Sequence, residues 1–366
     1  MAVDFHTEGV PLIRLAGLKS GANLLAGCNY LDPVKVAKKW SHFCVSAGDV
    51  LLSTSASLGE VAVVRENGVG AIPYTGIIRF RPRDERVVPE FIPFALQSPE
   101  FKQQIAEMGV GSVMNHFGPS HLKHMTIRIP PVAQQRAIAE VLGALDDKIA
   151  SNAALIETMD GLAAALTRSA LSDDAATLGS IAQVTMGSSP PGTSYNTSGK
   201  GLVFYQGVTD FGVRTPSNRM WTDAPVRTVE QGDILVSVRA PVGRTNIASE
   251  PTCVGRGLAG VRSLIGRNHT LFHLLRDIPE AWLPFQAGGT IFGSISKPQL
   301  LGVRVPTVRP DLVDGLEEKL RSLETRVIAA IGEDVKLSEL RDTLLPELMS
   351  GRLRVKDAER IVEGEA

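Results

Sequence analysis

Hydrophobic positions recur along the chain in two patterns, one typical of short strands and one of long helices. Residues 48–60 and 232–244 each read as a Gly-Asp turn, an apolar strand and a second turn closed by glycine. Residues 121–132 and 299–308 each contain a short β-branched strand ended by proline, which cannot donate to a strand ladder. The predicted order is a β-rich block, a helix, a second β-rich block and a second helix.

The two helical segments carry an apolar heptad repeat, which is typical of helices that pair. The first runs from Val132 to about Leu171 and the second from about Leu312 to Leu348. Each stripe has a polar residue near its middle, which fixes register at a cost in stability. The stripes predict an antiparallel coiled coil; the alternative is two amphipathic helices that each pack on their own domain. The positions expected in the helix-pairing seam are Leu142, Leu145, Ile149, Asn152, Ile156, Leu320, Leu323, Val327, Asp334 and Leu337.

These patterns predict an α+β chain with two pseudo-repeated β-rich domains, separated by long helices. A helix of roughly 36 residues is about 54 Å long. It would hold two similar domains apart by about one to two turns of B-DNA. The expected parts are a first β-rich domain at 1–130, a central spacer helix at 131–175, a second β-rich domain at 176–305, and a distal spacer helix with a C-terminal tail at 306–366.

The net charge of −1 at first sight disfavours a nucleic-acid binder, but the charge is unevenly distributed. Basic residues exceed acidic ones by 2 in 1–130 and by 5 in 176–305, whereas 131–175 and 306–366 each carry a net charge of −4. Ten of the twelve cations in 176–305 are arginine, which suits bidentate contact with phosphate and guanine. Ordinary surface scatter would also give this partition, so charge alone does not decide the function.

Several classes of protein are disfavoured. No run of about 18 apolar residues is present, and the N-terminal residues do not resemble a signal peptide. Cys28, Cys44 and Cys253 are odd in number and scattered, which fits a reducing cytoplasm better than a disulfide framework or a metal knuckle. We therefore expect a cytoplasmic protein with no membrane partner.

No enzymatic motif stands out. The spacing from Gly192 to Lys200 does not fit a phosphate-binding loop, and no GxSxG elbow occurs. His116, His121 and His124 cluster without Cys or carboxylate partners, so they are expected to be surface or core residues rather than zinc ligands. The sequence predicts no catalytic residue and no metal site.

Longer motifs add a family resemblance. The stretch IPPVAQQRAIAEVLGALDDKIASNAALIETMDGLAAALTRSAL (129–171) resembles the central conserved region of type I restriction-modification specificity subunits, and LRDTLLPELMSGRLRV (340–355) resembles their distal one. Residues 186–196 and 232–248 look like parts of a common target-recognition domain. The resemblance covers nearly the whole chain, and its helical motifs are the more specific part.

The resemblance implies a non-catalytic subunit that selects the DNA sequence. Each β-rich block would read one half of a bipartite, asymmetric target in double-stranded DNA. The helices would form the spacer and dock two methyltransferase subunits, which use S-adenosylmethionine, and an ATP-driven restriction/translocase subunit would complete the complex. No cofactor would bind this chain. The alternative from another class is a coiled-coil scaffold whose β-rich blocks bind protein or carbohydrate.

The first block departs from the family pattern at its start. Residues 8–17 parallel residues 199–208, but the second block has the further segment 178–200 upstream of this point. Family members usually carry such a segment in both blocks. We therefore expect a first domain that is truncated, started at the wrong methionine or built on a shorter variant.

Candidate DNA contacts follow from side-chain chemistry, since arginine matches guanine and Asn or Gln matches adenine. When the halves are aligned, Arg239 corresponds to Ser55 and Arg244 to Glu60. Such changes are expected if the domains read different half-sites, and equally allowed if these positions are unconstrained. The expected DNA-binding residues are Ser189, Tyr195, Asn196, Gln206, Arg239, Arg244 and Lys297 in the second block and Asn115, His116 and Lys123 in the first.

Overall fold

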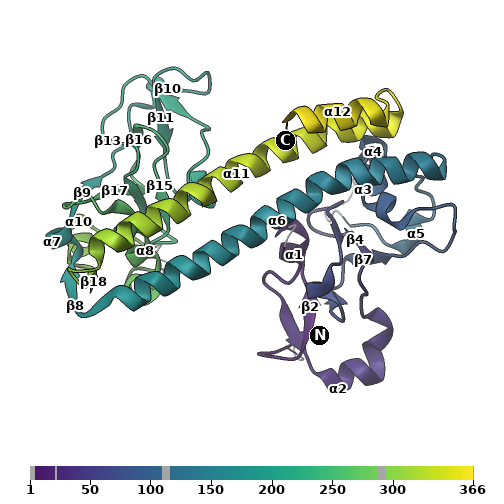
Figure 1. Cartoon of the computed structure of the whole chain (residues 1–366), viewed down its shortest axis with the longest axis horizontal. Coiled ribbons are helices and arrows are strands. Elements are labelled where there is room, and N and C mark those ends of the chain that lie inside the picture. The colour runs from purple at the N-terminus through teal and green to yellow at the C-terminus, as the bar shows by residue number, and fades with distance from the viewer. Residues whose placement is uncertain (1–4, 21–22, 109–115, 287–292, 366) are drawn as a thin grey trace. The chain divides into compact units, whose positions relative to one another are not determined.

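The computed structural model contains two compact units (Figure 1). It describes residues 5–20, 23–108, 116–286 and 293–365. Unit 1 comprises Met1–Ala154 and Glu333–Ala366, and unit 2 comprises Leu155–Gly332. Each unit therefore combines one β-rich block with half of each long helix.

The long helices are α6 (Val132–Ala170) and α11 (Val313–Ser350), which nearly match the predicted ranges. In unit 1, Leu142 of α6 shares a buried cluster with Leu348 of α11. In unit 2, Ala163 of α6 shares one with Leu320 of α11. Residue numbers rise along one helix as they fall along the other, so the predicted antiparallel pairing is confirmed.

Unit 2 is built on two β-sheets and a two-stranded ribbon. The first sheet has the order β15-β14-β17-β9 and the second the order β10-β12-β11-β16-β13, with β11 and β16 parallel. The strands of the first sheet are β9 (Ala182–Met186), β14 (Ile234–Ser237), β15 (Thr245–Ile247) and β17 (Leu258–Ser263). Those of the second are β10 (Tyr195–Asn196), β11 (Leu202–Tyr205), β12 (Trp221–Thr222), β13 (Thr228–Val229) and β16 (Thr252–Val254). The ribbon is formed by β8 (Leu171–Thr177) and β18 (Arg304–Val308).

Four helices cover the first sheet of unit 2 and fill its core. They are α7 (Leu178–Ile181), α8 (Asn268–Arg276), α9 (Pro279–Trp282) and α10 (Lys297–Gly302). Phe272 of α8 and Leu300 of α10 pack against Ile234 and Val236 of β14, all nearly inaccessible to solvent. Since β14 is buried on both faces, it reads as an unbroken apolar run in the sequence.

Unit 1 repeats this plan with fewer strands. Its sheets have the orders β5-β4-β7 and β1-β3-β2-β6. The strands are β1 (Phe5–His6), β2 (Val10–Ile13), β3 (Asn29–Leu31), β4 (Val50–Ser53), β5 (Val61–Val63), β6 (Ile72–Pro73) and β7 (Ile77–Phe80). The helices are α1 (Leu15–Ser20), α2 (Pro33–Lys35), α3 (Ile92–Gln97), α4 (Pro99–Met108), α5 (Pro119–Leu122) and α12 (Val355–Glu365). In unit 2, β17 pairs with β14 on one edge and with β9 on the other. In unit 1, the corresponding strand β7 pairs with β4, and no strand of the described part of unit 1 pairs with its other edge.

Candidate nucleic-acid interface

The same hydrogen-bonded hairpin turn follows β4 in unit 1 and β14 in unit 2. Ser53 Oγ donates to the Ser57 carbonyl and accepts from the Glu60 N–H at 2.8 Å. Ser237 Oγ donates to the Pro241 carbonyl at 2.6 Å and accepts from the Arg244 N–H at 2.8 Å. The buried serine in each strand therefore fixes the turn through backbone groups and leaves the turn side chains free to differ.

The glycines that close these turns are required by their conformation. Gly59 and Gly243 have φ of 82° and 86°, in the left-handed region that favours glycine. A Cβ on Gly243 would lie 2.2 Å from the ring of the buried Trp282, so both backbone and packing demand glycine there. This is the physical basis of the glycine pattern in the sequence.

A buried carboxylate anchors each strand at its start. Arg81 makes a bidentate ion pair with Asp49, and Arg262 makes the corresponding pair with Asp233 at 2.6 and 2.8 Å. Burial raises the pKa of Asp49, but the hydrogen bonds from Arg81 and from the Ser46 N–H outweigh it and lower that pKa below its usual range. The two units thus share the anchor as well as the turn.

In unit 2, exposed polar side chains gather where β11, β14, β16 and β17 meet. The Val238 N–H donates to the Gly257 carbonyl at 2.9 Å, which puts Arg256 beside the end of β14. Arg239 forms a bridge with Ser294, and Lys297 begins α10 three residues later. We call this set the unit 2 rim: Gln206, Arg239, Arg244, Arg256 and Lys297, all exposed and without an ion pair in the described part of the chain.

The structure brings four of the candidate residues into this rim: Gln206, Arg239, Arg244 and Lys297. Gln206 follows β11, and its N–H donates to the Asp210 carboxylate at 2.8 Å while its side chain stays exposed. Asp210 is itself held by Arg219, which leaves that arginine engaged. The Ser188 N–H donates to the Val254 carbonyl, so the half-buried Ser189 lies beside β16 and the rim.

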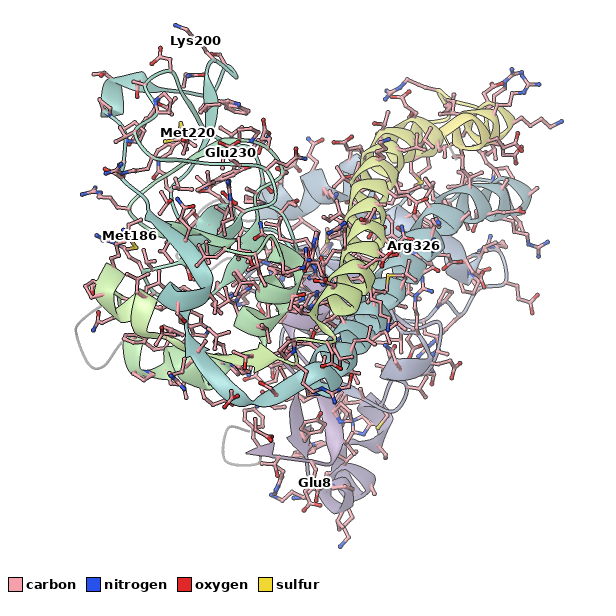
Figure 2. All side chains as sticks on the ribbon, turned by 60° about the vertical axis from the view of Figure 1, so that its left-hand side comes forward. Glu8, Met186, Lys200, Met220, Glu230 and Arg326 are labelled. Carbon is pink, nitrogen blue, oxygen red and sulfur yellow. The ribbon has the colours of Figure 1, made fainter. Side chains whose placement is uncertain are left out.

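Tyr195 and Asn196 are used mainly inside their own loop. The Tyr195 hydroxyl donates to the Pro190 carbonyl at 3.0 Å, and its ring lies 4.9 Å from that of Phe204. Asn196 Oδ1 accepts from the Lys200 N–H, and Nδ2 donates to the Lys200 carbonyl at 2.9 Å. Lys200 itself is exposed in the loop between β10 and β11 (Figure 2). These two side chains would have to leave existing contacts to bind DNA.

The first-unit candidates are less gathered. Asn115 lies outside the described residues. His116 is exposed and forms a bridge with Ser55, the counterpart of the Arg239–Ser294 bridge. Lys123 is exposed at the C-terminal cap of α5, and no hydrogen bond of the described residues links it to this bridge.

Sequence reasoning missed two residues that share this frame. Arg256 lies between Gly255 and Gly257, and the paired glycines are the signal that could have marked it. Arg14 was missed because the sequence alignment of residues 8–17 with residues 199–208 is shifted by one position and matches Arg14 with Tyr205. The Tyr74 N–H donates to Ile13 as the Gly255 N–H donates to Tyr205, which makes Arg14 the counterpart of Gln206.

The seam residues differ in burial. Leu142, Leu145, Leu320 and Val327 are buried, whereas Ile149, Ile156, Leu323, Asp334 and Leu337 are half-buried. Asn152 is 3% exposed, and its Nδ2 donates to Glu333 at 2.7 Å and to Asp334 at 2.8 Å. Burial raises the pKa of Asp334, the Asn152 hydrogen bond opposes this, and the net shift is upward.

A buried ion cluster attaches the β-rich block of unit 2 to both of its helical segments. Arg214, 2% exposed, donates to Asp160 of α6 and to Glu324 of α11, the latter at 2.9 Å. His273 of α8 lies 3.0 Å from the same Glu324. Burial raises the pKa of Glu324, but His273 and Arg214 outweigh it and lower that pKa below its usual range.

A second buried carboxylate, Glu317, lies on the same helix, α11. Glu317 of α11 accepts from the Thr270 N–H and hydroxyl, both at 2.8 Å, and contacts His269 Nδ1 at 2.8 Å. Burial raises the pKa of Glu317, but these hydrogen bonds outweigh it and hold the pKa at about 2. In unit 1 the corresponding support is an amide: Gln135, also buried, accepts from the Val88 N–H.

Among the described residues, no group of three or more His, Cys, Asp or Glu side chains is placed to hold a metal ion. No helix in the described ranges is long and apolar enough to cross a membrane.

Comparison with known proteins matches this architecture. Residues 32–159 match the model of the type I restriction modification DNA specificity domain. A putative type I restriction enzyme MjaX specificity subunit from Methanocaldococcus jannaschii is 25% identical, over 95% of this chain and 88% of that protein. These matches indicate a type I specificity subunit. The resemblance seen in its helical motifs is thus confirmed.

Two further proteins are similar to this chain. The MjaVIII specificity subunit of the same organism is 21% identical to this specificity subunit, over 40% of this chain and 35% of that protein. The crystal structure of the S subunit of a type I restriction-modification system from M. genitalium has a TM-score of 0.61 at 17% identity, covering 95% of this chain and 91% of that one. This second likeness supports the fold of two β-rich blocks and long helices.

Proposed function

We propose that this specificity subunit reads a bipartite, asymmetric sequence in double-stranded DNA, one half with each unit. The observation that supports the proposal is that both units keep the same hydrogen-bonded turn and anchoring ion pair, which we call the frame, while the side chains on the turn differ. Both units keep the buried serine, the closing glycine and the anchoring carboxylate, yet Arg239 stands where unit 1 has Ser55 and Arg244 where it has Glu60. Two scaffolds alike in backbone and different in rim chemistry suit two different half-sites.

The unit 2 rim has the chemistry of a DNA surface. Arg239, Arg244 and Lys297 are exposed and carry no ion pair in the described residues. Free cations of this kind neutralise phosphates and release counterions. The arginines of the same unit that build the fold are instead paired with carboxylates, as Arg214 and Arg262 are.

We further propose that α6 and α11 dock two methyltransferase subunits. Apolar side chains remain exposed on these paired helices: Leu162 is 49%, Ile328 40% and Val335 54% exposed. These side chains are available to a protein partner that covers them. S-adenosylmethionine and ATP would bind the methyltransferase and the restriction/translocase subunits, while this chain would be non-catalytic.

Duplex binding at several salt concentrations tests the DNA-reading proposal. Each phosphate contact contributes about −0.9 to the slope of log affinity against log salt concentration. The triple variant Arg239→Ala, Arg244→Ala, Lys297→Ala should make that slope shallower by up to about 2.7. The matched control is Arg304→Ala, an exposed arginine of β18 outside the rim, which should leave the slope unchanged.

Methylome sequencing tests the rest of the proposal. Cells expressing this chain with its neighbouring methyltransferase gene should gain N6-methyladenine at one two-part motif with an unspecified gap. Cells expressing the methyltransferase alone should not. If no motif appears and no duplex binds at any salt concentration, the chain is a scaffold rather than a DNA reader.

A further inference from the structure

Arg256 occupies the centre of the unit 2 rim. On one side, a Cβ added to Gly257 would lie 2.4 Å from the Gln206 carbonyl, so the turn that carries Arg256 packs directly on Gln206. On the other side, the Gly257 carbonyl accepts from the Val238 N–H, the residue before Arg239. Gln206 and Arg239 therefore flank Arg256.

The turn that carries Arg256 is fixed by its backbone. The Gly255 N–H donates to Tyr205 at 2.8 Å, and the Leu258 N–H donates back to Gly255 at 3.0 Å. A Cβ on Gly255 would press on the ring of Phe204, which is itself 1% exposed. A side chain presented on such a rigid turn loses little backbone freedom on binding, which favours precise recognition.

Arg256 also differs from the arginines that hold the fold of its unit together. Arg214, Arg219 and Arg262 are held in ion pairs. Arg256 is exposed, and the described residues offer it no ion pair or side-chain hydrogen bond. Its five N–H donors are therefore available to a ligand.

The same turn in unit 1 carries a different residue. The Thr54 N–H donates to Gly76 at 2.7 Å, as the Val238 N–H donates to Gly257 at 2.9 Å. This register makes Thr75 the counterpart of Arg256, with both side chains exposed. The backbone frame is kept and the side chain at its centre is exchanged.

We propose that Arg256 is a specificity-determining residue that reads guanine in the half-site of unit 2. This inference rests on the proposed function and adds a residue that determines the sequence read. Arginine matches the O6 and N7 acceptors of guanine with two parallel donors. The other cations of the rim, Arg239, Arg244 and Lys297, are then available to phosphates, whose contacts position a domain without reading the sequence.

Selection from randomised duplexes by the full chain tests the assignment. Arg256→Thr, which installs the unit 1 residue, should lose about 10- to 100-fold discrimination for guanine at one position of one half-site. The other half-site should keep its preference. Arg256→Lys keeps the charge but loses the planar pair of parallel donors, so it should weaken the discrimination for guanine with little change in salt dependence. The matched control is Arg304→Thr, which should leave every preference unchanged.

The outcomes separate the two proposals. If the wild-type chain selects a sequence and both Arg256 variants select the same one, Arg256 does not read DNA and the proposed function stands. A uniform loss of affinity with unchanged preferences makes Arg256 a phosphate contact, which also overturns the inference. If the wild-type chain selects nothing, the proposed function fails and this inference fails with it.

Discussion

The buried Arg214 of unit 2 allows a sharp test of what attaches a recognition block to its helices. Its guanidinium meets Asp160 of α6 and Glu324 of α11, and both Arg214 and Glu324 side chains are 2% exposed. Arg214→Ala would leave the buried Glu324 carboxylate with His273 as its remaining close partner. Breaking a buried pair in this way costs about 3–5 kcal/mol, because one charge stays buried without compensation. Since His273 Nε2 still lies 3.0 Å from Glu324, we expect the lower end, about 3 kcal/mol.

Tryptophan fluorescence during urea unfolding measures this loss. Trp221 and Trp282 lie in unit 2 and Trp40 in unit 1, so a Trp40→Phe background reports on unit 2. Arg214→Ala should lower the unfolding free energy of that transition by about 3 kcal/mol. The unit 1 transition, followed with Trp40 in a chain lacking Trp221 and Trp282, should not move.

The matched control is an ion pair between the β-rich block and α6 in unit 1. Arg65 pairs with Asp147 at 2.8 Å, but their side chains are 48% and 71% exposed. Removing an exposed pair costs about 0–1 kcal/mol, so Arg65→Ala should change unit 1 by less than about 1 kcal/mol. If Arg214→Ala costs no more than Arg65→Ala, the buried cluster does not hold the unit 2 block to its helices.

Three other predictions concern the paired helices. Glu317 has a pKa of about 2 in the folded chain against an ordinary 4.5, so its stabilisation is present above pH 4.5 and is lost as the pH falls toward 2. Unfolding titrations should show that lowering the pH from 7 to 3 costs the wild type about 2 kcal/mol more than Glu317→Gln, and equal losses would refute this. Leu145→Asp buries a charge in the seam, so it should lower the unfolding free energy by about 3–5 kcal/mol and abolish methyltransferase docking. The exposed control Ala144→Asp should lower the unfolding free energy by less than about 1 kcal/mol. Normal assembly of Leu145→Asp with the methyltransferase would contradict the spacer model. Asn152→Asp puts a third carboxylate beside Glu333 and Asp334, so it should lose about 2–4 kcal/mol at pH 7 and recover much of it near pH 4, as measured by thermal melts at both pH values.

The features that the sequence predicts well are those set by a local repeat. The heptad pattern locates α6 and α11 to within about two residues, because burial of one helical stripe demands that spacing. The turns after β4 and β14 are predictable because Gly59 and Gly243 must adopt positive φ. The first helix ends at Ala170, and the chain continues directly into β8, which pairs with the distant β18 and so has no local signal.

The features that the sequence does not predict depend on contacts between distant segments. Arg214 lies 54 residues from Asp160 and 110 from Glu324, and no spacing rule joins them. Asn196 has the right chemistry for a base contact, but its amide is engaged with Lys200 in its own loop. Side-chain type therefore nominates candidates, and only the surrounding hydrogen bonds show which of them are free to bind.

The separation of frame and rim explains how one fold can serve two half-sites. The serine, glycine and carboxylate that set the frame are buried and bonded to backbone or to arginine, so their loss would cost stability. Arg239 and Arg256 are exposed and contribute no ion pair in the described residues, so their replacement should change unfolding free energy by less than about 0.5 kcal/mol. Recognition can thus change at Arg256 without a cost in folding, and lost DNA selection in a variant at this position can be assigned to the contact itself.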